Sequence, residues 1–276
     1  MEPYYFGPDR RLFGVFHPPQ GAARSQGVVL CQPIGHEYGR THRAFRNLAQ
    51  QLARAGFAVM RFDYSGSGDS QGESGDARLA DWIFDLSAAI DELKRRGRVT
   101  HVTLVGLRLG AAIAALTAAD RRDVGGMVLW DPVISGSVYL QQLIALNEEW
   151  LAVRACADMN GSGPSWVVGC PMSDAMRADL AAMNLIGLDA EKFPRIVVFV
   201  SDEAAVHPAW IAGIRMLYGE KAVSVVAAAA DWHNPETVHT ALLPQQILQG
   251  ITAALSAKGE EGLRAKGEGQ DARKTL

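Results

Sequence analysis

One segment, residues 102–115 (VTLVGLRLGAAIAA), constrains the fold more than any other part of the chain. Its first residues are apolar and partly β-branched, which predicts a buried strand. A helix is expected at 111–119, so the chain must pass from strand to helix within a few residues. Gly106 and Gly110 lie on either side of Arg108, and glycine tolerates so tight a turn. The sequence therefore predicts a strand, a sharp turn with Arg108 at its tip, and a helix packed against the strand.

Strand and helix patterns alternate along most of the chain. Short apolar runs predict further strands at 27–31, 57–62, 126–130, 195–200 and 223–227. Apolar residues at helical spacing predict further helices at 42–55, 82–93 and 242–254. Strands that are apolar on both faces predict a mostly parallel sheet covered by helices on both faces. In such a sheet the functional site lies at the carboxyl ends of the strands.

After Asp131 the alternation stops for about 60 residues, which is far longer than an ordinary connection. Helices are expected in this part at 138–154 and 174–183. We therefore divide the chain into a core made of residues 1–135 and 193–257, and a helical cap insertion, residues 136–192. Charged residues and glycine predominate in residues 258–276, which predicts a disordered tail.

Composition excludes several classes of function. A net charge of −3 gives no electrostatic reason to expect nucleic-acid binding. No apolar run approaches the roughly 20 residues that span a bilayer. The first residues carry no apolar core flanked by basic residues, so we do not expect a secretory signal. The three cysteines have no metal-site or disulfide spacing, which fits a reducing cytoplasm. No motif implies a metal ion or an organic cofactor. From the composition as a whole we expect a cytoplasmic protein with a small-molecule partner.

Four segments accompany the turn at Arg108: LCQPIGHEYGRTHRAFRNLA, FDYSGSGDSQG, LWDPVISG and WVVGCPMS. Together they resemble the α/β-hydrolase superfamily and its serine-aminopeptidase-like branch. Within that branch the chain is similar to the exosortase A system-associated hydrolases, in which an elbow of the form GLRLGA occurs. The resemblance implies an α/β-hydrolase fold with a pocket between the sheet edge and the cap. The superfamily's elbow reads Gly-x-Ser-x-Gly, with serine as nucleophile, so Arg108 stands where the resemblance places that serine.

Arginine stays protonated at physiological pH and cannot attack a carbonyl, which excludes an acyl-serine intermediate at position 108. Three roles remain open for Arg108. It anchors a carboxylate or phosphate; it pairs with Asp202 or Asp131 in an inactive site; or it donates hydrogen bonds to a carbonyl or oxyanion while a histidine activates water. A buried unpaired arginine is costly, so we expect an anionic group beside it.

The resemblance implies an acid and a histidine after the late strands. Asp202 and His233 occupy those places, with Asp131 as a rival for the acid. Backbone N–H groups of Ile34 and Leu109 are the expected oxyanion donors. His36, in the expected loop 32–37 with Glu37, is either a second general base or a group that stabilises the loop.

Four other side chains are possible nucleophiles, and two further histidines are possible bases. Ser65, Ser67, Ser135 and Cys31 are expected near the same edge, but no base is spaced beside them, which favours turn formers and a core thiol. His207, beside Pro208, and His239, at an expected helix start, are taken as surface groups.

We therefore expect hydrolysis or transfer of an acyl group from an ester, a thioester or a related substrate, which can be anionic. Arg108, His233 and Asp202 are the expected catalytic residues. The alternative is an inactive pseudo-hydrolase that acts as a binding or scaffolding protein, in which Arg108 anchors an anionic ligand. An enzyme requires His233, whereas a pseudo-hydrolase tolerates its replacement by alanine.

Overall fold

The computed structural model describes residues 1–153, 166–187, 193, 195–202, 206–226 and 230–257. Its strands are β1 (Glu2–Phe6), β2 (Leu12–His17), β3 (Gln26–Cys31), β4 (Ala58–Phe62), β5 (His101–Leu107), β6 (Val124–Trp130), β7 (Trp166–Val167), β8 (Cys170–Pro171), β9 (Ile196–Val200) and β10 (Val223–Val225). Its α-helices are α1 (Gly35–Arg54), α2 (Leu79–Gly97), α3 (Leu109–Ala119), α4 (Gly136–Val153), α5 (Asp174–Ala182), α6 (Pro208–Tyr218) and α7 (Gln245–Ser256).

Eight strands form one sheet in the order β1-β2-β4-β3-β5-β6-β9-β10, and β7 pairs with β8 in a separate ribbon. From β4 to β10 neighbouring strands run parallel, whereas β1–β2 and β2–β4 are antiparallel. The prediction of a mostly parallel sheet is confirmed. The antiparallel β1 and β2 were not predicted, because β1 is exposed along most of its length and lacks a continuous apolar run.

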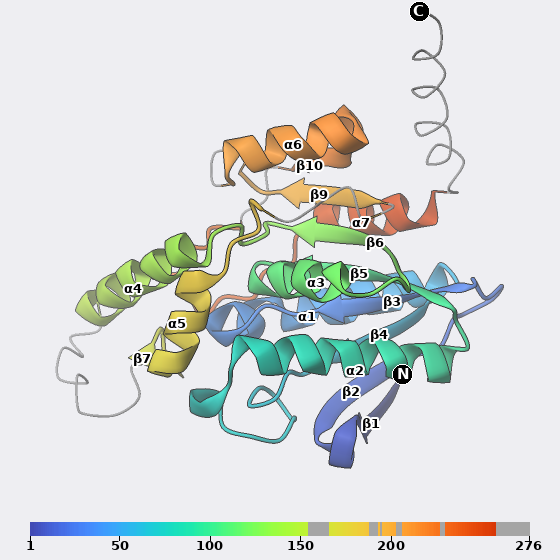
Figure 1. Ribbon diagram of the computed structural model, residues 1–276, viewed down its shortest axis with the longest axis horizontal. Helices are drawn as coiled ribbons and strands as arrows, with labels where there is room; N and C mark the ends of the chain where they lie inside the picture. The colour runs from blue at the N-terminus through green and yellow to red at the C-terminus, as the bar shows by residue number, and fades with distance from the viewer. Residues whose placement is uncertain (154–165, 188–192, 194, 203–205, 227–229, 258–276) are drawn as a thin grey trace, which may run out of the picture.

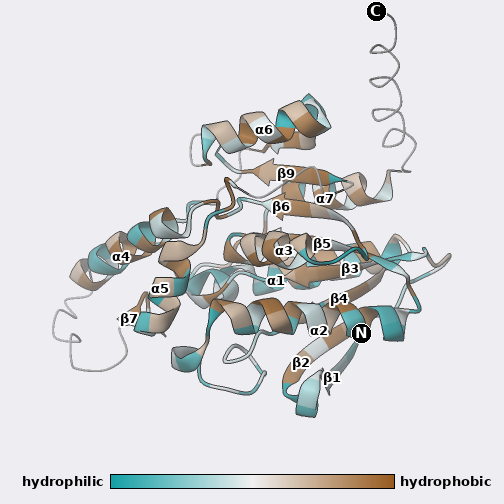
Figure 2. Cartoon of the chain, in the orientation of Figure 1, coloured by the Kyte–Doolittle hydropathy of each residue, from teal (hydrophilic) through white to brown (hydrophobic). Residues whose placement is uncertain are grey.

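Helices cover both faces of this sheet (Figure 1). Val28 and Leu30 pack with α1 and α7 on one face, while Val29 and Cys31 belong to the core under α2 and α3 on the other. Because successive residues of a strand point to opposite faces, a strand covered on both sides must be apolar throughout. Figure 2 shows that β6 and β9 are apolar along most of their length.

Helices α4 and α5 and the β7–β8 ribbon lie beyond the carboxyl ends of the central strands (Figure 1). They come from the stretch in which the sequence predicts a cap. Residues 154–165 and 188–192 of that stretch lie outside the described residues, as does the expected tail, 258–276. The division into core, cap and tail stays a prediction.

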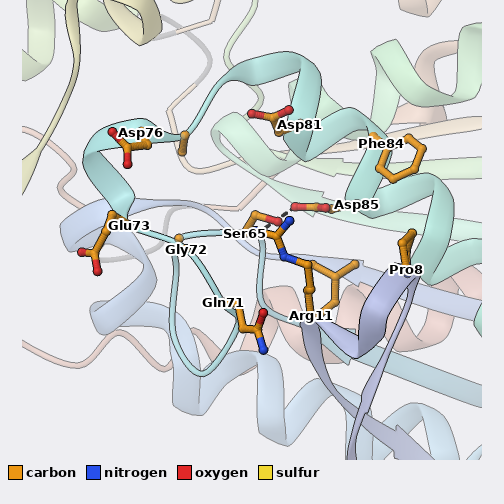
Figure 3. A pocket seen from close by; sticks show the side chains of 13 residues that line it. Pro8, Arg11, Ser65, Gln71, Gly72, Glu73, Asp76, Asp81, Phe84 and Asp85 are labelled. Carbon is orange, nitrogen blue, oxygen red and sulfur yellow. Dashed lines mark hydrogen bonds between the residues drawn. The ribbon is translucent and has the colours of Figure 1, made fainter.

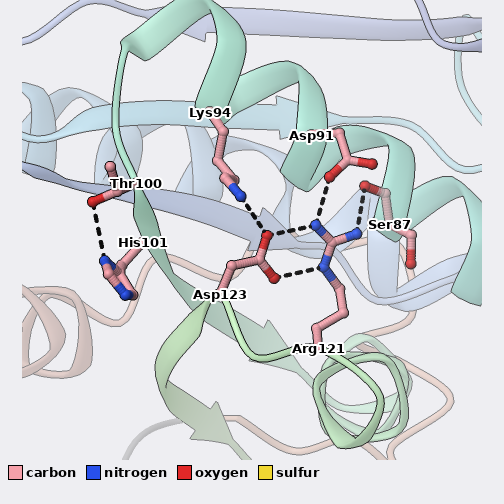
Figure 4. A network of polar contacts seen from close by, with 7 residues as sticks. All are labelled: Ser87, Asp91, Lys94, Thr100, His101, Arg121 and Asp123. Carbon is pink, nitrogen blue, oxygen red and sulfur yellow. Dashed lines mark hydrogen bonds and ion pairs between the residues drawn. The ribbon is translucent and has the colours of Figure 1, made fainter.

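An ion network lies at the opposite, amino edge of the sheet (Figure 4). Asp123, just before β6, accepts hydrogen bonds from Arg121 and from Lys94 of α2, and Arg121 also contacts Asp91. These bonds hold the pKa of Asp123 well below its usual range. The network joins α2 to the α3–β6 connection and lies at the edge opposite the expected site.

Helix boundaries differ from the prediction in places that affect the site. Helix α1 begins at Gly35, so His36 and Glu37 lie in its first turn rather than in a loop. Helix α6 was not predicted, and α7 begins at Gln245, so His239 precedes the helix rather than starting it. Within the described part of the chain, no helix is both long and apolar enough to cross a membrane.

Candidate active site

The turn between β5 and α3 has the strained geometry that the glycine pattern predicts. Arg108 has φ 53° and ψ −122°, a region that side chains with a β-carbon rarely adopt. A β-carbon on Gly106 would lie 2.5 Å from the Cα of Ala111, and one on Gly110 would lie 2.3 Å from the carbonyl oxygen of Gln32. Both glycines are therefore required by close backbone approach. Strain of this kind concentrates at functional sites.

The Arg108 guanidinium is buried and paired with Glu37. Its Nε donates a hydrogen bond of 2.9 Å to Glu37 Oε1, and the hydroxyl of Tyr139 donates one of 3.1 Å to Glu37 Oε2. Burial lowers the pKa of Arg108, but Glu37, Tyr139 and Asp131 together outweigh burial and hold that pKa above its ordinary value. Pairing with Asp131 or Asp202 was one of three roles left open for Arg108, and among the described residues its hydrogen-bonded partner is Glu37 instead. Helix α1 starts early enough to place the Glu37 carboxylate at the elbow.

The two Nη atoms of Arg108 have no hydrogen-bond partner among the described residues. The guanidinium carbon lies 5.3 Å from the ring centre of Tyr139 and 5.3 Å from that of Trp232. Arg108 lines a cavity of about 280 Å³ together with Asp131, Asp202 and His233. The structure thus brings the three expected catalytic residues, Arg108, Asp202 and His233, to one cavity.

His233 lies in a segment of turns after β10, where a histidine was expected. Its backbone N–H donates to Asp231 Oδ1 at 3.2 Å. Partial burial and the nearby Arg108 charge lower the pKa of His233, with Asp231 and Glu37 opposing that shift. A neutral imidazole is the form that accepts a proton, so His233 is suited to act as a general base near pH 7.

Asp131 is held in a different network from the one expected for an acid partner of histidine. Its Oδ1 accepts the backbone N–H of Ser201 at 2.6 Å, and its Oδ2 accepts the Ser201 hydroxyl at 2.7 Å and Trp232 Nε1–H at 2.9 Å. Asp131 is 4% exposed, so these bonds satisfy a carboxylate that water scarcely reaches.

The two residues expected to supply oxyanion donors lie at helix N-termini. Ile34 is the residue before α1, and Leu109 is the first residue of α3. The first N–H groups of a helix have no partner within it, and the helix dipole favours negative charge there. The close approach of Gly110 to the Gln32 carbonyl brings the two turns together. This arrangement suits an oxyanion, although the role of each amide stays a prediction.

A second cavity, of about 220 Å³, lies between the start of α1, the 66–68 turn and α4, α5 and β7–β8. Its lining is largely apolar and includes Leu143, Met172 and Met176. Tyr139 also lines it, so the partner of Glu37 faces this cavity. His36 borders the same space, and burial lowers the pKa of its imidazole. His36 is therefore placed beside the apolar cavity rather than in the cavity of His233.

A larger cavity, of about 450 Å³, lies beside α2 and the 65–77 segment (Figure 3). Its polar lining is mainly acidic, and Asp85 accepts a hydrogen bond of 2.8 Å from the backbone N–H of Ser65. Burial raises the pKa of Asp85. Neither Arg108 nor His233 lines this cavity, so its size does not make it the reaction site.

The structure describes the surroundings of three other nucleophile candidates, whose role as turn formers and a core thiol stays a prediction. Cys31 is fully buried, and burial raises the pKa of its thiol far above the ordinary value. The Ser135 hydroxyl forms a hydrogen bond with the Ser137 hydroxyl, and the backbone N–H of Ser65 donates a hydrogen bond to Asp85. No hydrogen bond between one of these side chains and a histidine occurs in the part of the chain that the structure describes.

Sequence reasoning missed four participants: Glu37 as the partner of Arg108, Tyr139, Ser201 and Trp232. The predicted need for an anion beside Arg108 was the one available signal for Glu37. Trp232 is next to His233 in the sequence, but nothing there indicated that it binds Asp131.

Comparisons with known proteins agree with this architecture. A family model described as serine aminopeptidase, S33, matches residues 25–179. A monoglyceride lipase of Rattus norvegicus is 29% identical over 127 residues, so the match spans 45% of this chain but only 40% of the length of that curated relative.

Solved structures resemble nearly the whole chain. One comes from work on carboxylesterases of the thaumarchaeon Nitrososphaera gargenis, with a TM-score of 0.60, 19% identity, and coverage of 92% of this chain and 98% of that chain. Another is an alpha-beta serine hydrolase homologue from Coxiella burnetii, with a TM-score of 0.54, 18% identity, and coverage of 92% and 95%. At these identities the likeness shows the fold alone, and the expected α/β-hydrolase fold is confirmed.

Proposed function

This chain belongs to the serine aminopeptidase S33 family of α/β hydrolases, and we propose that it hydrolyses an acyl ester or thioester with Arg108 in the place of the nucleophilic serine. The single observation that carries the proposal is the cavity shared by Arg108, Asp202 and His233. Arg108 occupies the strained turn between β5 and α3, which is where this superfamily places its nucleophile.

The proposed chemistry is direct attack by water. His233 accepts a proton from a water molecule, and the resulting hydroxide attacks the acyl carbon, as in general base catalysis. Arg108 Nη–H groups, with the backbone N–H groups of Leu109 and Ile34, stabilise the oxyanion. When the tetrahedral intermediate collapses, the carbon–oxygen or carbon–sulfur bond breaks, and the leaving group takes the proton from His233. Asp202 orients the imidazole and stabilises its charged form.

The substrate class follows from the two cavities. The apolar cavity lined by Leu143, Met172 and Met176 is suited to an acyl or alkyl chain. The sequence allowed an anionic substrate, but Glu37 already offsets the charge of Arg108, and Asp131 and Asp202 also line the polar cavity. These charges favour an uncharged acyl substrate. The match to a monoglyceride lipase, over its limited length, supports the same class.

The second candidate is a pseudo-hydrolase that binds a ligand without turning it over. The hydrogen bonds among Arg108, Glu37 and Tyr139 favour it, because they place a buried ion pair where the superfamily has its nucleophile. In this alternative the Nη edge of Arg108, which has no hydrogen-bond partner among the described residues, binds a carbonyl or carboxylate group of the ligand.

A single assay set separates the two candidates. Short-chain and medium-chain acyl p-nitrophenyl esters and acyl thioesters are offered to the wild-type protein, to His233→Gln and to His207→Gln, the last being an exposed histidine outside the cavity. A fluorophosphonate probe is applied to the same preparations. Turnover without labelling, lost in His233→Gln and kept in His207→Gln, supports hydrolysis by activated water. Labelling of a serine contradicts it. Absence of turnover, together with thermal stabilisation by acyl ligands, supports the pseudo-hydrolase.

A further inference from the structure

Trp232, the residue before His233, lies in a turn segment but is buried and hydrogen-bonded to a residue at the end of β6. Trp232 is 6% exposed, and its Nε1–H donates a hydrogen bond of 2.9 Å to Asp131 Oδ2. Asp131 follows β6 and also binds Ser201, which follows β9. One carboxylate thus connects the carboxyl ends of two neighbouring strands to the segment that carries His233.

Two arginines complete the environment of the Trp232 ring. The guanidinium carbon of Arg108 lies 5.3 Å from the ring centre and that of Arg40 lies 5.4 Å from it. At such distances a guanidinium is attracted to the ring face. Arg40 Nη1 also donates a 2.9 Å hydrogen bond to the carbonyl oxygen of Asp231, and the Arg40 carbonyl accepts the N–H of Leu242. Arg40 of α1 therefore holds this segment at Asp231 and at Leu242, and Asp131 holds it at Trp232.

From these contacts we infer that Trp232 is a positioning residue, held by Asp131, that fixes the imidazole of His233 in the cavity it shares with Arg108. Asp131 then acts through Trp232 and not as the acid partner of His233. The effect on catalysis rests on the proposed function. The contacts of Trp232 with Asp131 and the arginines do not depend on that function. Both oxygens of Asp131 accept hydrogen bonds from Ser201 or Trp232. Asp202 and Asp231 are the other carboxylates that line the cavity of His233.

Trp232→Phe is the direct test, because it removes the N–H donor and keeps an aromatic ring for Arg40 and Arg108. Trp130→Phe is the matched control. Trp130 is also buried, its ring centre lies 6.5 Å from that of Trp232, and its Nε1 has no hydrogen-bond partner among the described residues. Thermal melts identify any variant that has lost its fold.

The first readout is independent of activity. The imidazole of His233 is followed by NMR titration in the wild-type protein and in both variants. Desolvation and Arg108 lower the pKa of His233, whereas Asp231 and Glu37 raise it, so a displaced and better solvated imidazole titrates at higher pH. We expect that rise in Trp232→Phe and no change in Trp130→Phe. Unchanged His233 signals in a folded Trp232→Phe protein would overturn the inference, whether or not the protein is a hydrolase.

The second readout uses turnover of the p-nitrophenyl ester. A misplacement of about 1 Å costs on the order of 100-fold in rate, so we expect kcat of Trp232→Phe to fall by about that factor with KM little changed. Asp131→Asn is then combined with Trp232→Phe. If Asp131 acts through Trp232, the double variant is no slower than the slower single variant; multiplied losses would contradict this and return Asp131 to the role of acid partner.

Discussion

Arg108 Nε donates a 2.9 Å hydrogen bond to Glu37 Oε1 across 71 positions of sequence. The two side chains are 10% and 1% exposed, so the pair is nearly removed from water. A buried ion pair gains little over an apolar pair, but removal of one partner leaves an uncompensated charge. The stability of the elbow therefore depends on both residues being present.

Glu37→Gln removes the anion and leaves the Arg108 cation buried. We predict a loss of about 3–5 kcal/mol in the free energy of unfolding, measured by urea denaturation. Glu220→Gln is the control, because its carboxylate pairs with Arg215 at 85% exposure, and we predict a loss of less than about 1 kcal/mol. A Glu37→Gln protein as stable as the wild type would show that Arg108 is solvated or paired elsewhere.

The strain at position 108 is tested by comparing two variants with each other. Arg108→Gly and Arg108→Ala both remove the cationic partner of Glu37, but only alanine keeps a β-carbon at φ 53°. We predict that the glycine variant is more stable than the alanine variant by about 1–2 kcal/mol. Arg95→Gly and Arg95→Ala, at an exposed position of α2, are the control. There we predict that the alanine variant is the more stable, by up to about 1 kcal/mol, because glycine weakens a helix. The same order at both positions would contradict the strained geometry.

Gly110 is predicted to tolerate no side chain. A β-carbon there would lie 2.3 Å from the Gln32 carbonyl oxygen and 2.4 Å from that of Cys31, and neither backbone can move freely. We predict that Gly110→Ala costs about 1–3 kcal/mol or more of stability, as overpacking does. Gly213 is the control, because it lies in α6 and a β-carbon there would meet open space. We predict that Gly213→Ala stabilises the protein by about 0.5–1 kcal/mol. Equal effects of the two substitutions would refute the crowding at the elbow.

His17 gives stability a pH dependence that is separate from the site. Burial and the nearby Arg61 charge lower the pKa of His17 to about 4, and Arg61 Nε donates to its Nε2. In the unfolded chain histidine has a pKa of about 6.5. The unfolded state therefore binds the proton first as pH falls, and the contribution of His17 is lost between about pH 6.5 and 4.

The predicted loss from His17 is about 3 kcal/mol across that range, from the size of the pKa difference. It is measured as the free energy of unfolding at pH 7 and pH 4.5. His17→Gln keeps a side chain that accepts a hydrogen bond but does not titrate, so its stability should fall less over the same range. Parallel pH profiles for the two proteins would assign the acid sensitivity to other groups.

The central part of the fold could be predicted from sequence because its signals are local. The strand–turn–helix around Arg108 follows from the apolar run and the two glycines, and β5 and α3 appear where that pattern places them. The β1–β2 hairpin could not be found in this way. Strand β1 is exposed along most of its length, and it pairs with β2 through a register that no local pattern specifies.

The site was predictable to the extent that topology places it. His233 and Asp202 follow late strands, and they share a cavity with Arg108 as the chain order implies. The partner of Arg108 was not predictable, because it depends on whether α1 starts before or after Glu37. The role of Asp131 likewise depends on a tertiary contact with Trp232, 101 positions away.

The most direct test of hydrolysis without a serine nucleophile is intact-mass spectrometry during the first turnovers of an acyl p-nitrophenyl ester, with p-nitrophenol release recorded by stopped flow. We predict linear release from the first turnover, no burst, and a protein mass that never increases by an acyl group. A burst of one equivalent, with an acyl adduct that maps to a serine or to Cys31, would contradict direct attack of water on the acyl carbon.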